Sequence, residues 1–189
     1  LSRPVESVEV PSSVQSLLAA RIDRLDDASK QVLQTAAVIG NEIAGSLLER
    51  VGDMDGDTLQ SGLRRLVQSE FLYQASLYPE NEYAFKHPLT REVAYASLLR
   101  ERRRALHAEV ARALQALAGD TVDQRAPLIA HHWEQAGRAL EAARWHARIA
   151  DRLGWNVGEA IVHWRKVTEL LGEERDVPEA RALLGQARA

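Results

Sequence analysis

The stretch Asp57–Phe85, DTLQSGLRRLVQSEFLYQASLYPENEYAF, changes its hydrophobic period part-way along. Over 57–70 one apolar stripe recurs at helical spacing, with Asp57 placed to cap its start, and the stripe comprises Leu59, Leu63, Leu66 and Val67. Over 71–75 and 83–85 the side chains alternate instead, on either side of turn residues at 79–81. The stretch therefore predicts a helix followed by a β-hairpin.

The residues before this stretch predict further short helices. One helix opens at 11–13, and a second follows Asp26 and Asp27 and ends at Gly40. A third, short helix is expected over roughly 43–51. Several short helices followed by a small hairpin are the layout of a winged helix.

After the hairpin the pattern returns to helix. Pro88 suits a first helical position, and the apolar face expected to follow it comprises Leu89, Val93, Ala96 and Leu99. A longer helix is predicted over 101–118, with a break at Gly119 and Asp120. We therefore expect a linker at 1–10 and a winged-helix domain with C-terminal helices at 11–120.

The last third of the chain has the pattern of stacked helices. Glu141–His146 resembles Glu159–Trp164 at an offset of 18 positions. Half of a tetratricopeptide (TPR) unit of about 34 residues gives nearly this offset. One more helix is expected over 176–189. The predicted fold class is therefore mainly α, a winged-helix domain with a short β-hairpin followed by TPR-like α-solenoid helices at 121–189.

Composition and charge narrow the function classes. The 189 residues carry a formal net charge of -3 and include no cysteine. Without cysteine there is no disulfide scaffold or thiolate metal site, and we expect a cytoplasmic protein. No apolar run approaches the roughly 20 residues of a membrane helix. The mild negative charge argues against general nucleic-acid binding, and the start at Leu1 suggests a piece of a longer protein.

Three strings together resemble one known family. They are VPSSVQSLL at 10–18 leading to RIDRL at 21–25, VLQTAAVIG at 32–40, and FKHPLTREVAY at 85–95. They are similar to the region after the ATPase core in bacterial STAND-type signal-transduction ATPases, related to MalT-type and LuxR-type regulators and also found fused to class III adenylate or guanylate cyclases. The resemblance runs from Val10 to Leu171 and implies the order ATPase, winged helix, helical repeats.

The third string also resembles the Met-His-Asp motif of nucleotide-switch ATPases, whose histidine closes over the β-phosphate of bound ADP. His87 matches that histidine, whereas Lys86 and Pro88 replace the Met and the Asp. The resemblance implies that His87 senses nucleotide in the intact protein. The residues themselves place His87 where a strand gives way to a helix, and helix N-termini favour phosphate. The alternative is a helix-capping histidine without a ligand.

We find no catalytic set in the sequence. There is no Gly-rich phosphate loop ending in Lys and Ser or Thr, and the acidic loop at 52–57 lacks the spacing of a calcium loop. Packing and surface roles, rather than metal binding, are expected for His131, His132, His146 and His163. We therefore predict no enzymatic activity, no metal site and no cofactor in this chain, and assign ADP or ATP to the parent protein.

Two sets of side chains are candidate surfaces. Arg64 and Arg65 precede the hairpin, and Arg102 and Arg103 lie in a basic run; both pairs are candidates for nucleic-acid contact or for docking on an ATPase core. A partner surface for an unknown protein or small-molecule inducer is possible at Trp133, Trp145 and Trp164, although tryptophan more often fills space between stacked helices.

The leading hypothesis is a non-catalytic regulatory segment. It would couple the nucleotide state of an upstream ATPase domain in the same chain to an output domain, either a transcription regulator or a nucleotide cyclase. The alternative is a sequence-specific DNA-binding winged-helix transcription factor. Two arginines on one helix face fall short of the roughly 6–10 phosphate contacts of a strong binder, so we expect nucleic acid not to be a partner.

Overall fold

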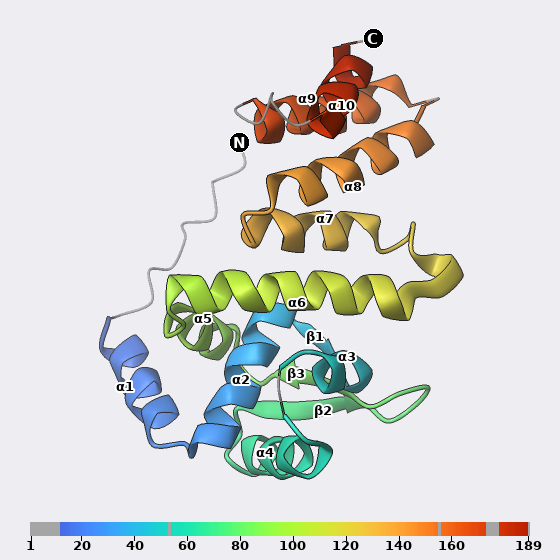
Figure 1. Ribbon diagram of the computed structural model, residues 1–189. Helices are drawn as coiled ribbons and strands as arrows, with labels where there is room; N and C mark the ends of the chain where they lie inside the picture. Colours follow the sequence, from blue (N-terminus) through green and yellow to red (C-terminus); the bar gives the residue numbers. More distant parts are fainter. Residues whose placement is uncertain (1–11, 53, 155, 173–177, 189) are drawn as a thin grey trace, which may run out of the picture. The chain divides into compact units, whose positions relative to one another are not determined.

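The computed structural model describes residues 12–52, 54–154, 156–172 and 178–188 (Figure 1). Most of these residues are helical, and the strands among them form a three-stranded antiparallel sheet. The mainly α fold class predicted from the sequence is therefore confirmed. Within the described residues, no helix combines the length and the apolar character needed to cross a membrane.

The chain forms two compact units. Among the described residues, the N-terminal unit comprises 12–45 and 54–98, and the C-terminal unit comprises 46–52 and 99–188. This division differs from the predicted domain boundary after residue 120, because the long helix at 100–118 packs against the helix that follows it.

Two helices open the N-terminal unit, α1 at Ser12–Asp23 and α2 at Asp27–Ile39. Asp26 caps α2, because its carboxylate accepts hydrogen bonds from the backbone N–H (2.9 Å) and the hydroxyl (2.8 Å) of Ser29. Gly40, at φ 143°, ends α2 in a conformation that L side chains rarely adopt. The predicted second helix and its end at Gly40 are confirmed.

The sheet has the strand order β1–β3–β2, with bounds Glu42–Ala44, Glu82–Phe85 and Leu72–Ser76. β2 and β3 form the predicted hairpin, with Leu72 opposite Phe85. The sequence does not predict β1, because three residues are too few for alternation to be read. β1 pairs with β3 through Ile43, which is opposite Tyr83 and fully buried. Helix α3, Gly45–Arg50, follows it directly.

Helix α4, Gly56–Gln68, lies before the hairpin as predicted, but two details differ. Its cap is Asp55, whose carboxylate accepts from the Thr58 backbone N–H (2.9 Å) and hydroxyl (2.7 Å), so the prediction of Asp57 was wrong. The predicted stripe is buried except for Val67, which is 37% exposed. The cap lies two residues earlier than expected, on the preceding aspartate.

Helix α5, Pro88–Ala96, begins with Pro88 in its first turn as predicted. The prediction of which face of α5 is buried was wrong. The structure buries Thr90 and Ala94, and leaves Ala96 exposed. Each residue turns the helix by about 100°, so a shift of one position selects a different face.

The C-terminal unit is a succession of helices that pack on their sequence neighbours (Figure 1). The first of these helices ends at Ala118, and a 3₁₀ turn at Gly119–Thr121 follows it. The sequence predicted a helix break at this position, and Gly119 has φ 47°. The helices are α6 (Arg100–Ala118), α7 (Ala126–Gln135), α8 (Ala139–Arg152), α9 (Val157–Leu171) and α10 (Pro178–Arg188). The two similar segments at offset 18 lie on α8 and α9.

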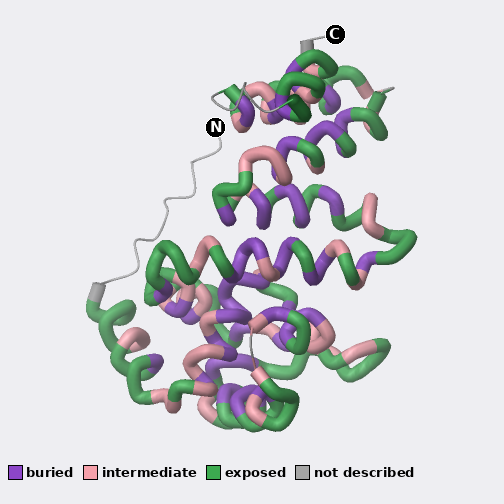
Figure 2. The backbone as a smooth tube through the Cα atoms, in the orientation of Figure 1, coloured by how far each residue is buried: buried purple, intermediate pink, exposed green. Residues whose placement is uncertain are grey.

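Buried positions recur along the helices of this unit (Figure 2), and small side chains occupy many of them. The cluster that joins α8, α9 and α10 contains Ala143, Ala147, Val167, Leu171, Ala180 and Leu184. A second cluster joins α7 and α8 through Ala126, Ala130 and Ile149. Alanine allows helix axes to approach closely, which suits stacked helices.

Candidate functional site

His87 lies where β3 gives way to α5. It takes the N-cap position with an extended backbone (φ -137°, ψ 132°), and Pro88 follows within the first turn. The His87 carbonyl accepts from the Thr90 backbone N–H at 3.0 Å, but the imidazole makes no capping hydrogen bond. The side chain is exposed at a helix N-terminus. It therefore occupies the strand–helix junction expected from the sequence, with its ring nitrogens not used by the cap.

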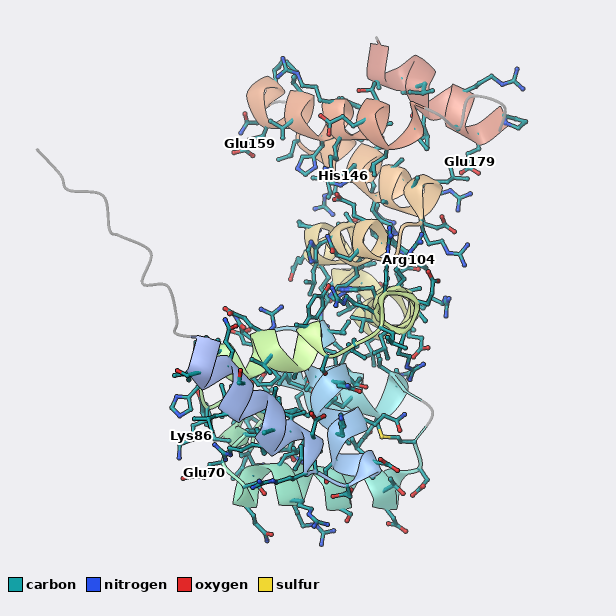
Figure 3. All side chains as sticks on the ribbon, turned by 90° about the vertical axis from the view of Figure 1, so that its left-hand side faces the viewer. Glu70, Lys86, Arg104, His146, Glu159 and Glu179 are labelled. Atoms are coloured by element: carbon teal, nitrogen blue, oxygen red, sulfur yellow. The ribbon has the colours of Figure 1, made fainter. Side chains whose placement is uncertain are left out.

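The basic neighbours of His87 surround one carboxylate, that of Glu70. Lys86 forms an ion pair with Glu70 at 2.5 Å (Figure 3). The pKa of Glu70 is held below its ordinary value, first by the hydrogen bond and charge of Lys86 and then by the charges of Arg21 and His87. Glu70 has φ 59°, a left-handed conformation that is uncommon without glycine.

Arg21 is held in place by the end of α4. Its guanidinium lies 4.9 Å from the centre of the Phe71 ring and donates to the Ser69 carbonyl at 3.0 Å. Arg21, Lys86 and His87 thus bring three basic groups to the start of α5, with Glu70 as the counter-charge. Such a group can bind an anion if the anion competes with Glu70.

Arg64 and Arg65 lie on the exposed face of α4 as predicted, but with different surroundings. Arg65 forms an ion pair with Asp26 at 3.1 Å. Arg64 instead lines a cavity of about 240 Å³ between α4 and the hairpin, together with Gln60, Gln68 and Gln74. The charge of Arg65 is therefore partly neutralised within the unit, whereas Arg64 lines a cavity of mixed polar and apolar character.

Arg102 and Arg103 lie near the start of α6, in the C-terminal unit. Arg102 approaches Glu109 at 3.8 Å, and Arg103 is half-buried. The run that appears continuous in sequence is divided by the helix turn, so its members face different neighbours. Arg104, from the same run, lines a separate cavity with Arg112 and Arg138.

The three candidate tryptophans pack inside the C-terminal unit. Trp133 is 6% exposed, while Trp145 and Trp164 are half-buried. The side-chain amide of Gln115 lies beside two of the indoles. With its oxygen turned toward them, that oxygen accepts hydrogen bonds from Trp133 Nε1 at 2.7 Å and from Trp145 Nε1 at 3.1 Å. Trp164 packs on the core cluster of α8, α9 and α10. Their positions fit the filling of space between helices, and Trp133 offers little surface to a partner.

Sequence reasoning missed a polar chain that crosses α7, α8 and α9. His146 Nδ1 lies 2.9 Å from His163 Nδ1, and His146 Nε2 lies 2.8 Å from a carboxylate oxygen of Glu134 (Figure 3). Lys166 holds the other oxygen of Glu134 at 3.2 Å. His146 is 17 positions from His163 and 12 from Glu134, and Lys166 lies further still from Glu134 along the chain, so no local motif marks these partners.

Burial and these contacts shift the pKa values of Glu134 and His163. Burial alone raises the pKa of Glu134, but hydrogen bonds from His146 and Lys166 outweigh burial and hold it below its ordinary value. Burial, followed by the charge of His146, lowers the pKa of His163. Among the residues that the structure describes, no group of three or more His, Cys, Asp or Glu side chains is arranged to hold a metal ion.

Comparisons with known proteins give one distant likeness. No family model matches the chain, and no solved structure matches it. The chain is similar to an uncharacterized protein of Rhizobium meliloti (strain 1021), with 29% identity over 132 residues that cover 69% of this chain and 13% of that protein. The aligned segment is thus a small part of a much longer relative.

Proposed function

We propose that the N-terminal unit is a winged-helix domain and that the C-terminal unit is a TPR-like array. Together they act as a non-catalytic relay of a STAND-type ATPase. The order of elements supports the first assignment, because short helices lead to α4 and then to the β2–β3 hairpin, with β1 completing the sheet. Helices that stack on their sequence neighbours support the second. The much longer relative is consistent with a segment that works within a larger protein.

The observation that carries the proposal is the position of His87. Its exposed imidazole stands at the N-terminus of α5 and makes no capping hydrogen bond. In the proposed relay, His87 donates to the β-phosphate of ADP held by an upstream ATPase domain, and this contact keeps the protein in its off state. An inducer that acts on the helical array weakens the contact and releases the output domain. A cytoplasmic location, with access to ADP and ATP, follows from this role.

Nucleotide retention in the full-length protein tests the relay. His87→Ala removes one charge-assisted hydrogen bond, so ADP should dissociate about 10- to 100-fold faster and basal output should rise. Release of a fluorescent ADP analogue measures the first effect. His131→Ala is the matched control, because His131 is also an exposed histidine but lies in the C-terminal unit. Unchanged ADP release in His87→Ala would remove the proposal.

Specific DNA binding is the second candidate function. It is favoured by the polar face of α4, where Arg64, Gln60 and Gln68 line a cavity with Gln74 of the hairpin. Arginine and glutamine are the side chains that read guanine and adenine edges. Salt-dependent, sequence-specific binding by the 189-residue chain, lost in Arg64→Gln and kept in Arg65→Gln, would support this function over the relay.

A further inference from the structure

A cavity of about 370 Å³ opens on α6 in the C-terminal unit. Its lining includes the small residues Ala105, Ala108 and Ala136, which leave room beside the helix. The volume lies within the range of small-molecule sites. The remaining lining is mostly charged, so the cavity is of a kind that takes a polar ligand.

Three arginines from two places in the chain meet at this cavity. Arg104 and Arg112 lie two turns apart on α6, and Arg138 comes from the turn between α7 and α8. Arg104 Nε donates to the Ala136 carbonyl at 3.1 Å, and its Nη2 lies 3.5 Å from the Gly137 carbonyl (Figure 3 labels Arg104). The guanidinium of Arg104 is therefore held at the end of α7.

Gly137 makes this approach possible. It has φ 68°, and a Cβ built on it would lie 2.0 Å from Arg104 Nη2. Satisfying the last carbonyls of α7 is one role of Arg104. That role does not account for Arg112 or Arg138, which line the same cavity from other positions.

The charges around the cavity are not balanced. In the part of the chain that the structure describes, no ion pair involves Arg104, Arg112 or Arg138, whereas on α8 a carboxylate pairs with each of Arg144, Arg148 and Arg152.

The acidic residues of the lining do not neutralise the three arginines. Glu109 accepts from the Gly52 backbone N–H at 3.2 Å and lies 3.8 Å from Arg102. Glu101 is then the other carboxylate of a lining that contains three arginines. A second cavity of about 270 Å³ adjoins the first through Glu109 and Arg112 and adds Arg50. Like charges at this density repel one another, and an anion between them removes that repulsion.

We propose that this cavity binds the phosphate group of a small molecule. A guanidinium presents parallel N–H donors that match phosphate oxygens, and arginine is preferred wherever planar, bidentate recognition of phosphate is needed. Arg104 is positioned by backbone carbonyls, while Arg112 and Arg138 complete the site from either side. The inference rests on the cavity alone and does not depend on the proposed relay, which leaves the chemistry of its inducer open.

Calorimetric titration of the 189-residue chain with inorganic pyrophosphate tests the site. Ionic strength is held constant with sodium chloride, because salt screens exposed charges. We expect saturable binding with one pyrophosphate per chain. Arg112→Gln and Arg138→Gln should each weaken it about tenfold or more, since each removes a charge-assisted contact.

Arg165→Gln is the matched control. Arg165 is exposed on α9 and lines none of these cavities, so its replacement changes the net charge equally and should leave binding unchanged. Far-ultraviolet circular dichroism checks that each variant is folded. Arg138 is exposed, so Arg138→Gln should leave the buried core intact. The proposal is overturned if pyrophosphate shows no saturable binding, if Arg165→Gln weakens it as much as Arg112→Gln, or if citrate binds as tightly.

Discussion

The two units are stabilised by different kinds of core. The N-terminal unit buries large apolar side chains, among them Leu33, Leu66 and Leu72, against a sheet. The C-terminal unit packs alanines between helices and adds buried polar contacts, such as the 2.9 Å contact between His107 and His132. In the first unit, stability should depend mainly on apolar volume; in the second, it should depend on close approach and on polar pairing as well.

Unfolding of the C-terminal unit can be followed by itself through tryptophan fluorescence. All four tryptophans lie between residues 133 and 164, and all four tyrosines lie between residues 73 and 95. Tryptophan emission therefore reports on the C-terminal unit, and far-ultraviolet circular dichroism reports on both.

The largest expected effect comes from removing volume in the N-terminal unit. Leu33 is fully buried on α2, so Leu33→Ala should lower the free energy of unfolding by about 2–5 kcal/mol. Urea denaturation followed by circular dichroism measures the loss, and the transition seen by tryptophan should move less. Leu17→Ala is the control, because Leu17 is 68% exposed and its truncation should change stability by about 0.5 kcal/mol or less. Equal losses in the two variants would contradict the proposed dependence on buried volume.

Adding volume should destabilise the C-terminal unit. Ala143 is fully buried in the cluster of α8, α9 and α10, so Ala143→Leu should force the helices apart and cost about 1–3 kcal/mol. Urea denaturation followed by tryptophan emission measures the cost. Ala182→Leu, at an exposed position on α10, should be nearly neutral. If Ala143→Leu stabilises the unit, close helix approach is not what its alanines provide.

A smaller effect is expected at the cap of α4. Asp55→Ala removes the two hydrogen bonds to Thr58 and should lower the midpoint of thermal unfolding by about 2–4 °C. Asp57→Ala, in the first turn of the same helix, should lower that midpoint by about 1–2 °C or less. Thermal unfolding followed by circular dichroism compares the two, and a larger loss in Asp57→Ala would show that the helix is capped differently in solution.

The last prediction concerns pH and the C-terminal unit alone. The pKa of His163 is lowered by burial, so the folded unit disfavours its protonated form, which the unfolded chain accepts. His163 therefore contributes stability above its unfolded pKa of about 6.5, and that stability is lost as pH falls toward the lower folded pKa. Glu134 acts in the same direction at lower pH: its pKa is also lowered, so its contribution is lost as pH falls below about 4.5.

Urea midpoints read from tryptophan emission at about pH 7.5 and about pH 5.5 measure this loss. His163→Gln should make the difference between the two midpoints smaller, because glutamine does not titrate. His131→Gln, at an exposed histidine outside the contact between His146 and Glu134, should keep the full difference. A difference that is unchanged in His163→Gln would exclude His163 as its source.

Features that depend on neighbours in sequence were predictable. The hairpin followed from the change of period at Phe71, the end of α2 from Gly40, and the first turn of α5 from Pro88, since each reflects local backbone preferences. The position of His87 at a strand–helix junction followed for the same reason. The cap of α4 was misassigned, because Asp55 and Asp57 are equally suited to the role and only the path of the chain selects one.

Features that depend on distant residues were not predictable. β1 gains its hydrogen bonds from β3, about 40 positions further along the chain. His146 and His163 are 17 positions apart, and Arg104 and Gly137 are 33 apart. No periodicity relates such pairs, because their approach depends on how whole helices pack.

The sequence by itself determined the helical class, the hairpin and the approximate bounds of several helices of this protein, because caps, turns and hydrophobic periods act within a few residues. Only the tertiary structure decided that α6 packs with the later helices, that Glu134 joins two histidines, and that three arginines share one cavity. Those contacts form where separate helices meet, and the free energy that selects them comes from packing between elements rather than from local conformational preference.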